Sequence, residues 1–543
     1  RFTTRLTIKL PRRCLAGARQ HGSHSGAIAA PRAGHLQESL TMADSMSTTV
    51  VAGDTSRTFF GHPRGLATLF FTEMWERFTY YGMRAILVLF LVASIEEGGL
   101  GVDDRTGNAI YGLYISGTYL LSLAGGWIAD RLTGAQRAVW WGGILIMAGN
   151  GLLATGSKPL FFLGLMLIVF GVGLLKPNIS AIVAQLYPEG GARRDAGYYI
   201  FYMGINVGAF LGSTLVPILA DHFGWRMGFA APAVGMFFGL LQFAVTRRYL
   251  GHAGVEPGMS HADPAATQRA WWIVAAVVTA IVAVVLLAIA GRIHIDPVDL
   301  LESSFWAISA FAAGYFAYML FFAGLDTVER KRVLVMLALF IACAMFWAGF
   351  EQAGASLNIF ADRHTDRQIG GWLMPAGVLQ NVNPLFIIIF SPVFASLWVA
   401  LGKRNLDPSA PVKFALGLVL MGIGFVVMYF AARYVVAGDK VLPTWLVLTY
   451  LFHTFGELCL SPVGLSSMTK LAPTRFVGQA LGVWFLATAI GNNLAGQFAG
   501  EFDPNNIAAM PNQFLGIFWW GAIGGAVMFL ISPVAKRLMG GVK

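Results

Sequence analysis

The sequence predicts an all-α polytopic membrane protein with fourteen transmembrane helices. Hydrophobic residues make up 56% of the 543 residues and charged residues only 12%, whereas a soluble domain usually has about 25% charged residues. Apolar runs recur along the chain, and a run of roughly 20 residues can cross the hydrocarbon core of a bilayer as a helix. Glycine is abundant, with 64 residues, and small residues allow helices to pack closely in lipid.

A basic tail precedes the first predicted helix. Residues 1–57 contain Pro, Gly and Ser without a strong hydrophobic period, so we expect them to be disordered. The predicted transmembrane spans follow at 65–93, 108–129, 137–156, 160–187, 196–220, 228–247, 270–291, 303–323, 333–361, 373–400, 411–434, 443–469, 476–499 and 513–537.

The seventh and eighth predicted spans set the domain organisation. Neither Ala270–Gly291 nor Trp306–Gly324 contains a charged residue, which is typical of helices that face lipid. We therefore expect an inserted two-helix hairpin, with its linkers at 251–328, between two six-helix bundles at 58–250 and 329–543. This arrangement indicates a major facilitator fold, whose halves enclose a cavity near the bilayer midplane and rock about it.

The cations predict how the chain is oriented in the membrane. Of the net charge of +10, residues 1–50 supply +5, because they hold seven Lys or Arg residues and two acids. The remaining cations fall mostly in alternate loops, and cytoplasmic loops carry an excess of Lys and Arg. We therefore expect a multi-pass protein with both termini in the cytoplasm. The same distribution indicates a lipid bilayer, and no nucleic acid, as the partner of these charges.

Motifs for other chemistries are absent from the sequence. The chain has no Gly-rich phosphate loop followed by Lys and Ser or Thr, and no Gly-x-Ser-x-Gly element. Its ten histidines show no metal-ligand spacing. These absences predict that the chain is not an enzyme and that it uses no metal or other cofactor.

The first predicted span carries a stripe of charged and tyrosine side chains. At 3.6 residues per turn its members share one helix face: Glu73, Glu76, Arg77, Tyr80, Tyr81 and Arg84. Because buried charges are costly in a membrane, we favour a functional stripe over a structural one whose charges only neutralise each other. A guanidinium favours the ionised form of a neighbouring carboxyl group, so a carboxyl group that loses Arg77 as its partner would take up a proton. The stripe therefore predicts coupling between protonation and rearrangement.

Three further charges lie inside predicted spans. They are Lys176 in the fourth span, Glu351 in the ninth and Glu457 in the twelfth. Each alone is also compatible with a structural ion pair. Together with Arg77 and Arg84 they predict a bipolar cavity, cationic in the first half and acidic in the second, which suits a zwitterion with separated ends.

Polar and aromatic residues complete the predicted lining. Asn206 and Asn383 carry amides that bind peptide groups, although amides also join membrane helices. Trp347 lies one turn before Glu351, and Trp484 lies in a span with flanking glycines. For both tryptophans a core position is the alternative to contact with a ligand.

Several motifs resemble those of the proton-coupled oligopeptide transporter (POT/PTR) family of the major facilitator superfamily. The segment Glu73–Arg77 is similar to the family's E-x-x-E-R motif, and Phe201–Gly208 to F-Y-x-x-I-N-x-G. Gly456–Ser466 matches G-E-L-x-x-S-P-x-G-L-S, and Gly125–Arg131 is similar to the superfamily's loop between the second and third helices. The resemblance covers residues 58–540. The inserted hairpin resembles bacterial members, which implies a bacterial inner membrane.

The resemblance implies import of di- and tripeptides driven by protons, with the proton as the coupling ion, and we expect a monomer. It implies a proton-coupling group formed by Glu73, Glu76, Arg77, Lys176 and Glu351. It implies a substrate-binding group formed by Tyr80, Tyr81, Arg84, Tyr119, Lys176, Asn206, Trp347, Glu351, Asn383, Glu457, Ser461 and Trp484. In that group Arg84, Lys176 and Asn206 would hold the carboxylate end of the peptide, and Glu457 with Asn383 would meet its amino end.

Two departures from the family pattern concern local geometry and coupling. The fourth span has Leu174 and Leu175 where the family usually has more glycine before Lys-Pro, and the second span lacks the histidine of animal members. The alternatives to peptide import are a major facilitator carrier of another small zwitterion or drug, and a transport-dead peptide sensor.

Overall fold

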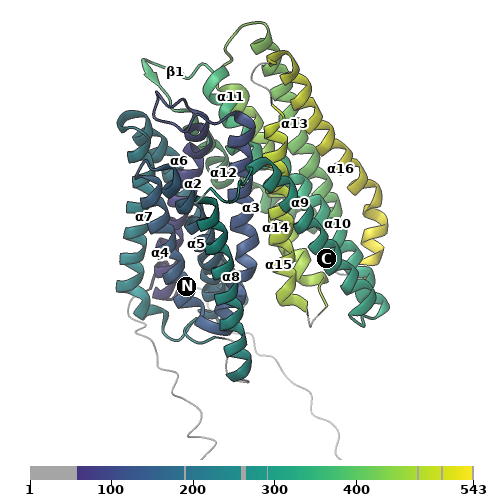
Figure 1. Ribbon diagram of the computed structural model, residues 1–543. Coiled ribbons are helices and arrows are strands. Elements are labelled where there is room, and N and C mark those ends of the chain that lie inside the picture. Colours follow the sequence, from purple (N-terminus) through teal and green to yellow (C-terminus); the bar gives the residue numbers. More distant parts are fainter. Residues whose placement is uncertain are drawn as a thin grey trace, which may run out of the picture. The chain divides into compact units, whose positions relative to one another are not determined.

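The computed structural model describes residues 58–188, 191–257, 264–289, 291–473, 476–502 and 506–540. The predicted disordered tail, residues 1–57, lies outside the described residues. Long α-helices dominate the described chain (Figure 1). They are α2 (Arg64–Val92), α3 (Asp104–Ile128), α4 (Ala135–Leu153), α5 (Lys158–Gln185), α6 (Gly191–Phe223), α7 (Trp225–Thr246), α8 (Pro264–Ile289), α9 (Pro297–Ala317), α10 (Thr327–Phe350), α12 (Val382–Lys403), α13 (Ala410–Val436), α14 (Thr444–Leu471), α15 (Val477–Gly500) and α16 (Met510–Leu538).

Short elements connect or extend these helices. They are the π-helical turns η1 (Ala129–Thr133) and η3 (Tyr318–Phe322), the 3₁₀ helices η2 (Arg247–Leu250), η4 (Glu351–Gly354), η5 (Ala376–Asn381) and η7 (Ile507–Ala509), the short helix α11 (Ser356–His364), and the strands β1 (Gln368–Ile369) and β2 (Trp372–Leu373). Each of the fourteen predicted spans contains most of one long helix, so the predicted all-α membrane architecture is confirmed. Within the described residues, ten helical segments are long and apolar enough to cross a membrane by length and composition.

The ninth predicted span is not one continuous helix. α10 ends at Phe350, η4 follows, and α11 begins only at Ser356. Between them Ala355 leaves the helical region, with φ −116° and ψ −109°. The predicted span at 333–361 is confirmed as a membrane-length segment, Thr327–His364, but its helix is interrupted. The apolar pattern of the sequence continues across the break and does not reveal it.

The segment after α11 also differs from the prediction. β1 and β2 pair antiparallel, with Ile369 opposite Trp372. Gly370 and Gly371 join them with positive φ values of 55° and 87°, as a tight two-residue hairpin turn requires. The tenth span then begins as the 3₁₀ helix η5 before α12, so its first turns are wound more tightly than predicted.

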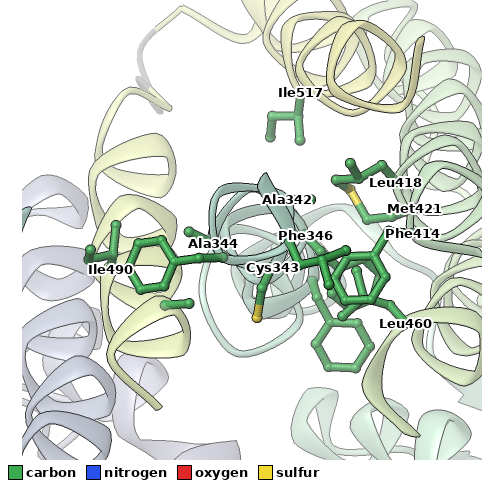
Figure 2. Packing of buried hydrophobic residues seen from close by; sticks show 14 of the residues in the cluster. Ala342, Cys343, Ala344, Phe346, Phe414, Leu418, Met421, Leu460, Ile490 and Ile517 are labelled. Carbon is green, nitrogen blue, oxygen red and sulfur yellow. The ribbon is translucent and has the colours of Figure 1, made fainter. Parts of the chain in front are cut away.

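The helices form an N-terminal half, α2–α7, and a C-terminal half, α10–α16. In the N-terminal half α2 packs against α6 and α7, and α4 packs against α5. Figure 2 shows the core of the C-terminal half around α10. Its labelled side chains come from α10, α13, α14, α15 and α16: Ala342, Cys343, Ala344, Phe346, Phe414, Leu418, Met421, Leu460, Ile490 and Ile517. Burial of such apolar side chains against one another fixes the five helices as a unit.

The two halves meet along α3 and α15. Gly112 and Gly496 face each other so closely that a Cβ added to Gly112 would lie 2.9 Å from the Cα of Gly496. Asn108 also crosses this seam, because its Nδ2 donates to the carbonyl oxygen of Ala499 at 3.3 Å. Small residues thus bring the two backbones into direct contact.

The inserted pair α8 and α9 is not uniformly exposed. α8 is exposed along most of its length, as expected for a lipid-facing helix. α9 instead packs against both α3 and α15. Its Leu301 is buried, and Asn493 of α15 donates to the carbonyl oxygen of Leu301 at 3.1 Å and to Ser304 Oγ at 2.7 Å. α9 therefore covers the seam between the halves.

Candidate functional site

The charged stripe of α2 begins with a compact three-residue cluster. Glu73, Glu76 and Arg77 are all at most 3% exposed. Arg77 Nε lies 3.2 Å from Glu73 Oε1 and also pairs with Glu76 Oε2. Glu73 Oε2 and Glu76 Oε1 lack a hydrogen-bond partner among the described residues. A buried carboxylate oxygen without a hydrogen-bond partner destabilises the ionised form of the group. Glu73 or Glu76 could therefore accept a proton on its free oxygen.

α6 holds this cluster at close range through its glycines. A Cβ added to Gly208 would collide with the carbonyl oxygen of Met74 and lie 2.9 Å from Arg77 Cβ. Gly212, one turn later, lies equally close to the backbone of Phe78. The glycine at the end of the Phe201–Gly208 motif therefore allows α6 to press against the stripe of α2.

An ion pair joins the halves at the far end of the stripe. Arg84 of α2 lies 2.9 Å from Glu351 Oε2, and both side chains are at most 5% exposed. The hydroxyl of Tyr111 on α3 donates to the same oxygen at 3.4 Å. Arg84 was predicted to face Glu457 across a cavity, with Glu351 exchanging partners that include Arg84; in the structure Arg84 and Glu351 are in direct contact.

The break after α10 positions Glu351. Its neighbour Gln352 donates to the carbonyl oxygen of Ala495 on α15 at 2.9 Å and accepts from Ser356 Oγ at 2.6 Å. Gly354 lies against Tyr111 and Arg84, with no space for a side chain. Glu351 therefore lies at a helix end that is fixed from several sides, next to the other half of the protein.

Lys176 and Glu457 have different partners. Lys176 Nζ lies 3.6 Å above the ring of Tyr119, a distance suited to a cation–π contact, and it makes no ion pair with a described acid. Asn383 Nδ2 donates to Glu457 Oε2 at 3.1 Å and lies 3.0 Å from Thr454 Oγ1. Among the described residues, Lys176 and Glu457 are thus held by neutral side chains rather than by an opposite charge.

Comparisons with known proteins place this arrangement in a family. Residues 136–512 match the model of the POT family. The chain belongs to the POT family. As a member of this family, it is a multi-pass membrane transporter and not an enzyme.

POT-family relatives match the chain over nearly its whole length. A peptide transporter, YePEPT, from Yersinia enterocolitica is 41% identical over 89% of this chain and 96% of its own length. A di-/tripeptide transporter from Lactococcus lactis is 36% identical over 90% of this chain and 99% of its own length. A crystal structure of a peptide transporter POT in complex with sulfate has a TM-score of 0.84 and 41% identity, covering 91% of this chain and 99% of that one. The fold described above is therefore a POT-family fold.

The aromatic residues predicted for the site of this POT-family chain divide into two groups. Tyr80 and Tyr81 lie edge to face beside the charges, with Arg77 5.1 Å above the Tyr80 ring and Arg84 5.7 Å above the Tyr81 ring. Trp484 instead packs in the hydrophobic core, 6.2 Å from the ring of Phe414.

Three other predicted binding residues have only local or unsatisfied contacts. Asn206 Nδ2 donates to the carbonyl oxygen of Tyr202, one turn earlier in its own helix. Trp347 Nε1 and Ser461 Oγ are buried without a hydrogen-bond partner among the described residues. Both atoms are buried, so a ligand could reach them only after a rearrangement, whereas Asn206 already uses one amide hydrogen within α6.

The prediction missed two tyrosines of α3. Tyr111 is fully buried against Glu351, and Tyr114 stacks on Tyr80 with ring centroids 6.2 Å apart. The signal was their spacing, because Tyr111, Tyr114 and Tyr119 stand at i, i+3 and i+8 and share a helix face. Because the predicted span at 108–129 contains no charged residue, this row of tyrosines resembles an ordinary packing face.

Proposed function

We propose that this POT-family protein imports di- and tripeptides together with protons by alternating access. We place it in a bacterial inner membrane as a monomer, with both termini in the cytoplasm. The observation that carries the proposal is the buried ion pair between Arg84 and Glu351, which joins the two halves. The cluster around Arg77 lies seven residues earlier, about two turns along the same helix.

The ion pair gives a physical reason for coupling. If the halves part at this point, Arg84 and Glu351 must separate, and an isolated charge in a dry site costs several kcal/mol. A proton on Glu351 removes one of these charges. The carboxylate of a peptide, or the acids beside Arg77, can then compensate Arg84. Separation thus becomes accessible when proton and substrate are both bound.

The charge arrangement also suits a peptide. The carboxylate end of the peptide would be held by Arg84 and Lys176. Lys176 has no acidic partner in the described chain. Glu457, which is held by an amide rather than by a cation, would bind the ammonium end with Asn383 beside it. The names of the relatives, a peptide transporter and a di-/tripeptide transporter, support this substrate class.

The roles of the remaining residues follow from their places. Glu73, Glu76, Arg77, Lys176 and Glu351 would exchange the proton. Tyr80, Tyr81, Tyr119 and Trp347 would contact the side chains of the peptide, together with Ser461. Asn206 and Trp484 would contribute only after a rearrangement, since one is bonded within its helix and the other lies in the core.

Uptake by proteoliposomes under an imposed pH gradient tests the proposal. We expect Glu76→Gln to abolish gradient-driven accumulation of a dipeptide, because glutamine cannot take up or release the coupling proton. Exchange of labelled for unlabelled dipeptide should persist, because binding does not require this carboxyl group. Glu302→Gln, an exposed acid on α9, is the matched control and should behave as wild type.

Three outcomes would contradict the proposal. Normal accumulation by Glu76→Gln would remove this residue from proton coupling. Uptake of a single amino acid or a drug, but of no dipeptide, would favour the carrier of another small solute. Binding of dipeptide without any exchange across the membrane would identify a sensor.

A further inference from the structure

A cavity lies away from the charged site, between the start of α4 and the end of α7. It has a volume of about 280 Å³, close to the lower end of about 300 Å³ for ligand pockets. Its lining residues are Gln136, Arg137, Trp140, Phe243, Arg247 and Val255. All except Val255, which lies in the linker after α7, belong to the N-terminal half, and none is among the residues assigned above to protons or peptide.

The cavity brings together two arginines that are far apart in sequence. Arg137 lies in the first turn of α4 and Arg247 directly after α7. Neither makes an ion pair or side-chain hydrogen bond with another residue in the described chain. Both side chains are exposed, so solvent screens the repulsion between them, and an anion bound in the cavity would interact favourably with both. The pair therefore favours an anionic ligand.

The walls of the cavity are fixed rather than formed by loose loops. Gln136 Nε2 donates to the carbonyl oxygen of Ala253 at 2.7 Å, and its backbone N–H donates to that of Gly254 at 2.8 Å. Gly254 N–H in turn donates to Gln185 Oε1 of α5 at 2.7 Å. The linker that carries Val255 is thus fastened to both α4 and α5.

Two aromatic residues, Trp140 and Phe243, form another part of the cavity lining. The rings of Trp140 and Phe243 stack with centroids 6.3 Å apart. Both arginines lie at the end of the transmembrane helices that the charge pattern assigns to the cytoplasmic side, at the level where Trp and cations meet lipid headgroups. A ligand with a negative head and an apolar body fits such a cavity better than a soluble anion does.

We infer that this cavity binds a phosphate-bearing anion, the headgroup of an anionic phospholipid. The guanidinium groups of Arg137 and Arg247 hold the phosphate, and the partly exposed ring of Trp140, packed on the buried Phe243, contacts the glycerol and first acyl carbons. Basic pockets between helices on this side of membrane proteins bind such headgroups. The inference depends on neither the proton nor the peptide.

The test titrates phosphatidylglycerol into the full chain in detergent and follows the rise in Tm. Arg137→Gln/Arg247→Gln should need roughly thirty-fold more phosphatidylglycerol for half the rise, from about 1 kcal/mol for each arginine at 1.4 kcal/mol per ten-fold. Arg404→Gln/Arg537→Gln removes two exposed cations from the same predicted side and should stay within about two-fold of wild type. Phosphatidylcholine should give no such difference between variants.

Further arms distinguish the source of the phosphate and guard against misfolding. If inorganic phosphate alone raises Tm in wild type but not in Arg137→Gln/Arg247→Gln, the site is supported and its ligand is a soluble anion. Arg137→Lys/Arg247→Lys keeps the charges and should recover part of the lipid effect. Identical titrations for wild type and Arg137→Gln/Arg247→Gln, or equal losses in both Gln pairs, would overturn the inference.

Discussion

Arg363 of α11 forms a two-pronged ion pair with Asp104 at the start of α3, with N–O distances of 2.6 and 2.8 Å. It joins the two halves at the end of the molecule where α2 ends. In the same region Asn358 Nδ2 donates to the carbonyl oxygen of Ala85 at 3.0 Å. The halves are therefore closed against each other from Glu351 to this end.

The pair between Asp104 and Arg363 should contribute measurably to this closure. We expect a coupling free energy of about 1 kcal/mol between Asp104→Asn and Arg363→Gln, because the contact is bidentate but Arg363 is about a third exposed and partly screened. Thermal unfolding of wild type, both single variants and the double variant gives this number. Strictly additive losses in the two single variants would show that the contact contributes nothing.

Breaking the buried pair between Arg84 and Glu351 should cost more. Glu351→Gln leaves the guanidinium of Arg84 buried without its counter-ion, so we expect a loss of about 3 kcal/mol in unfolding free energy. Arg84→Met/Glu351→Leu replaces both charges by apolar groups and should recover most of that stability. Both variants should fail in proton-driven uptake. A stable double variant that still accumulated dipeptide against a gradient would contradict the coupling role.

Recognition of the peptide amino end should depend on Glu457. N-acetylation of a dipeptide should weaken its competition for uptake by about ten-fold, since a charge-assisted hydrogen bond contributes about 1.5–3 kcal/mol. Glu457→Gln should reduce this preference for the free amine. Equal competition by acetylated and free dipeptides in wild type would place the amino end elsewhere.

Adding a methyl group at Gly208, where α6 contacts the charged stripe of α2, should destabilise the protein. We expect Gly208→Ala to lower the unfolding free energy by about 1–3 kcal/mol, the usual cost of overpacking, because the added Cβ would collide with the Met74 carbonyl group and Arg77. Gly151→Ala is the matched control, since a Cβ there meets no atom within 4 Å and alanine favours a helix. A comparison of Tm for both variants decides the point.

The helices and the charged stripe of α2 could be predicted from the sequence, because both depend on local spacing. Apolar runs of membrane length locate the spans, and the period of 3.6 places Glu73, Arg77 and Arg84 on one face whatever the rest of the protein does. The contact of Arg84 with Glu351 needed tertiary structure, although the opposite charges of the two halves suggested it.

Features set by packing could not be predicted in the same way. The break at Glu351 interrupts an apolar run without Pro, and it depends on Gly354 fitting against Tyr111 of another helix. Lys176 was expected to face an acid, and its contact with the ring of Tyr119 depends on how α5 lies beside α3. Tyr111 lies in a predicted span without charged residues, and its place in the site depends on contact with Glu351, which is distant in sequence.

The position of α9 has a consequence for the engineering of this chain. Asn493 directs its amide hydrogens at Leu301 and Ser304 of α9, and in lipid an amide without such partners costs several kcal/mol. Removal of the inserted pair would uncover that amide and the glycine contact at Gly112 and Gly496. A twelve-helix version of this protein could therefore not be made by deletion alone. It would need a new surface on α3 and α15 that satisfies Asn493 and covers the glycine contact.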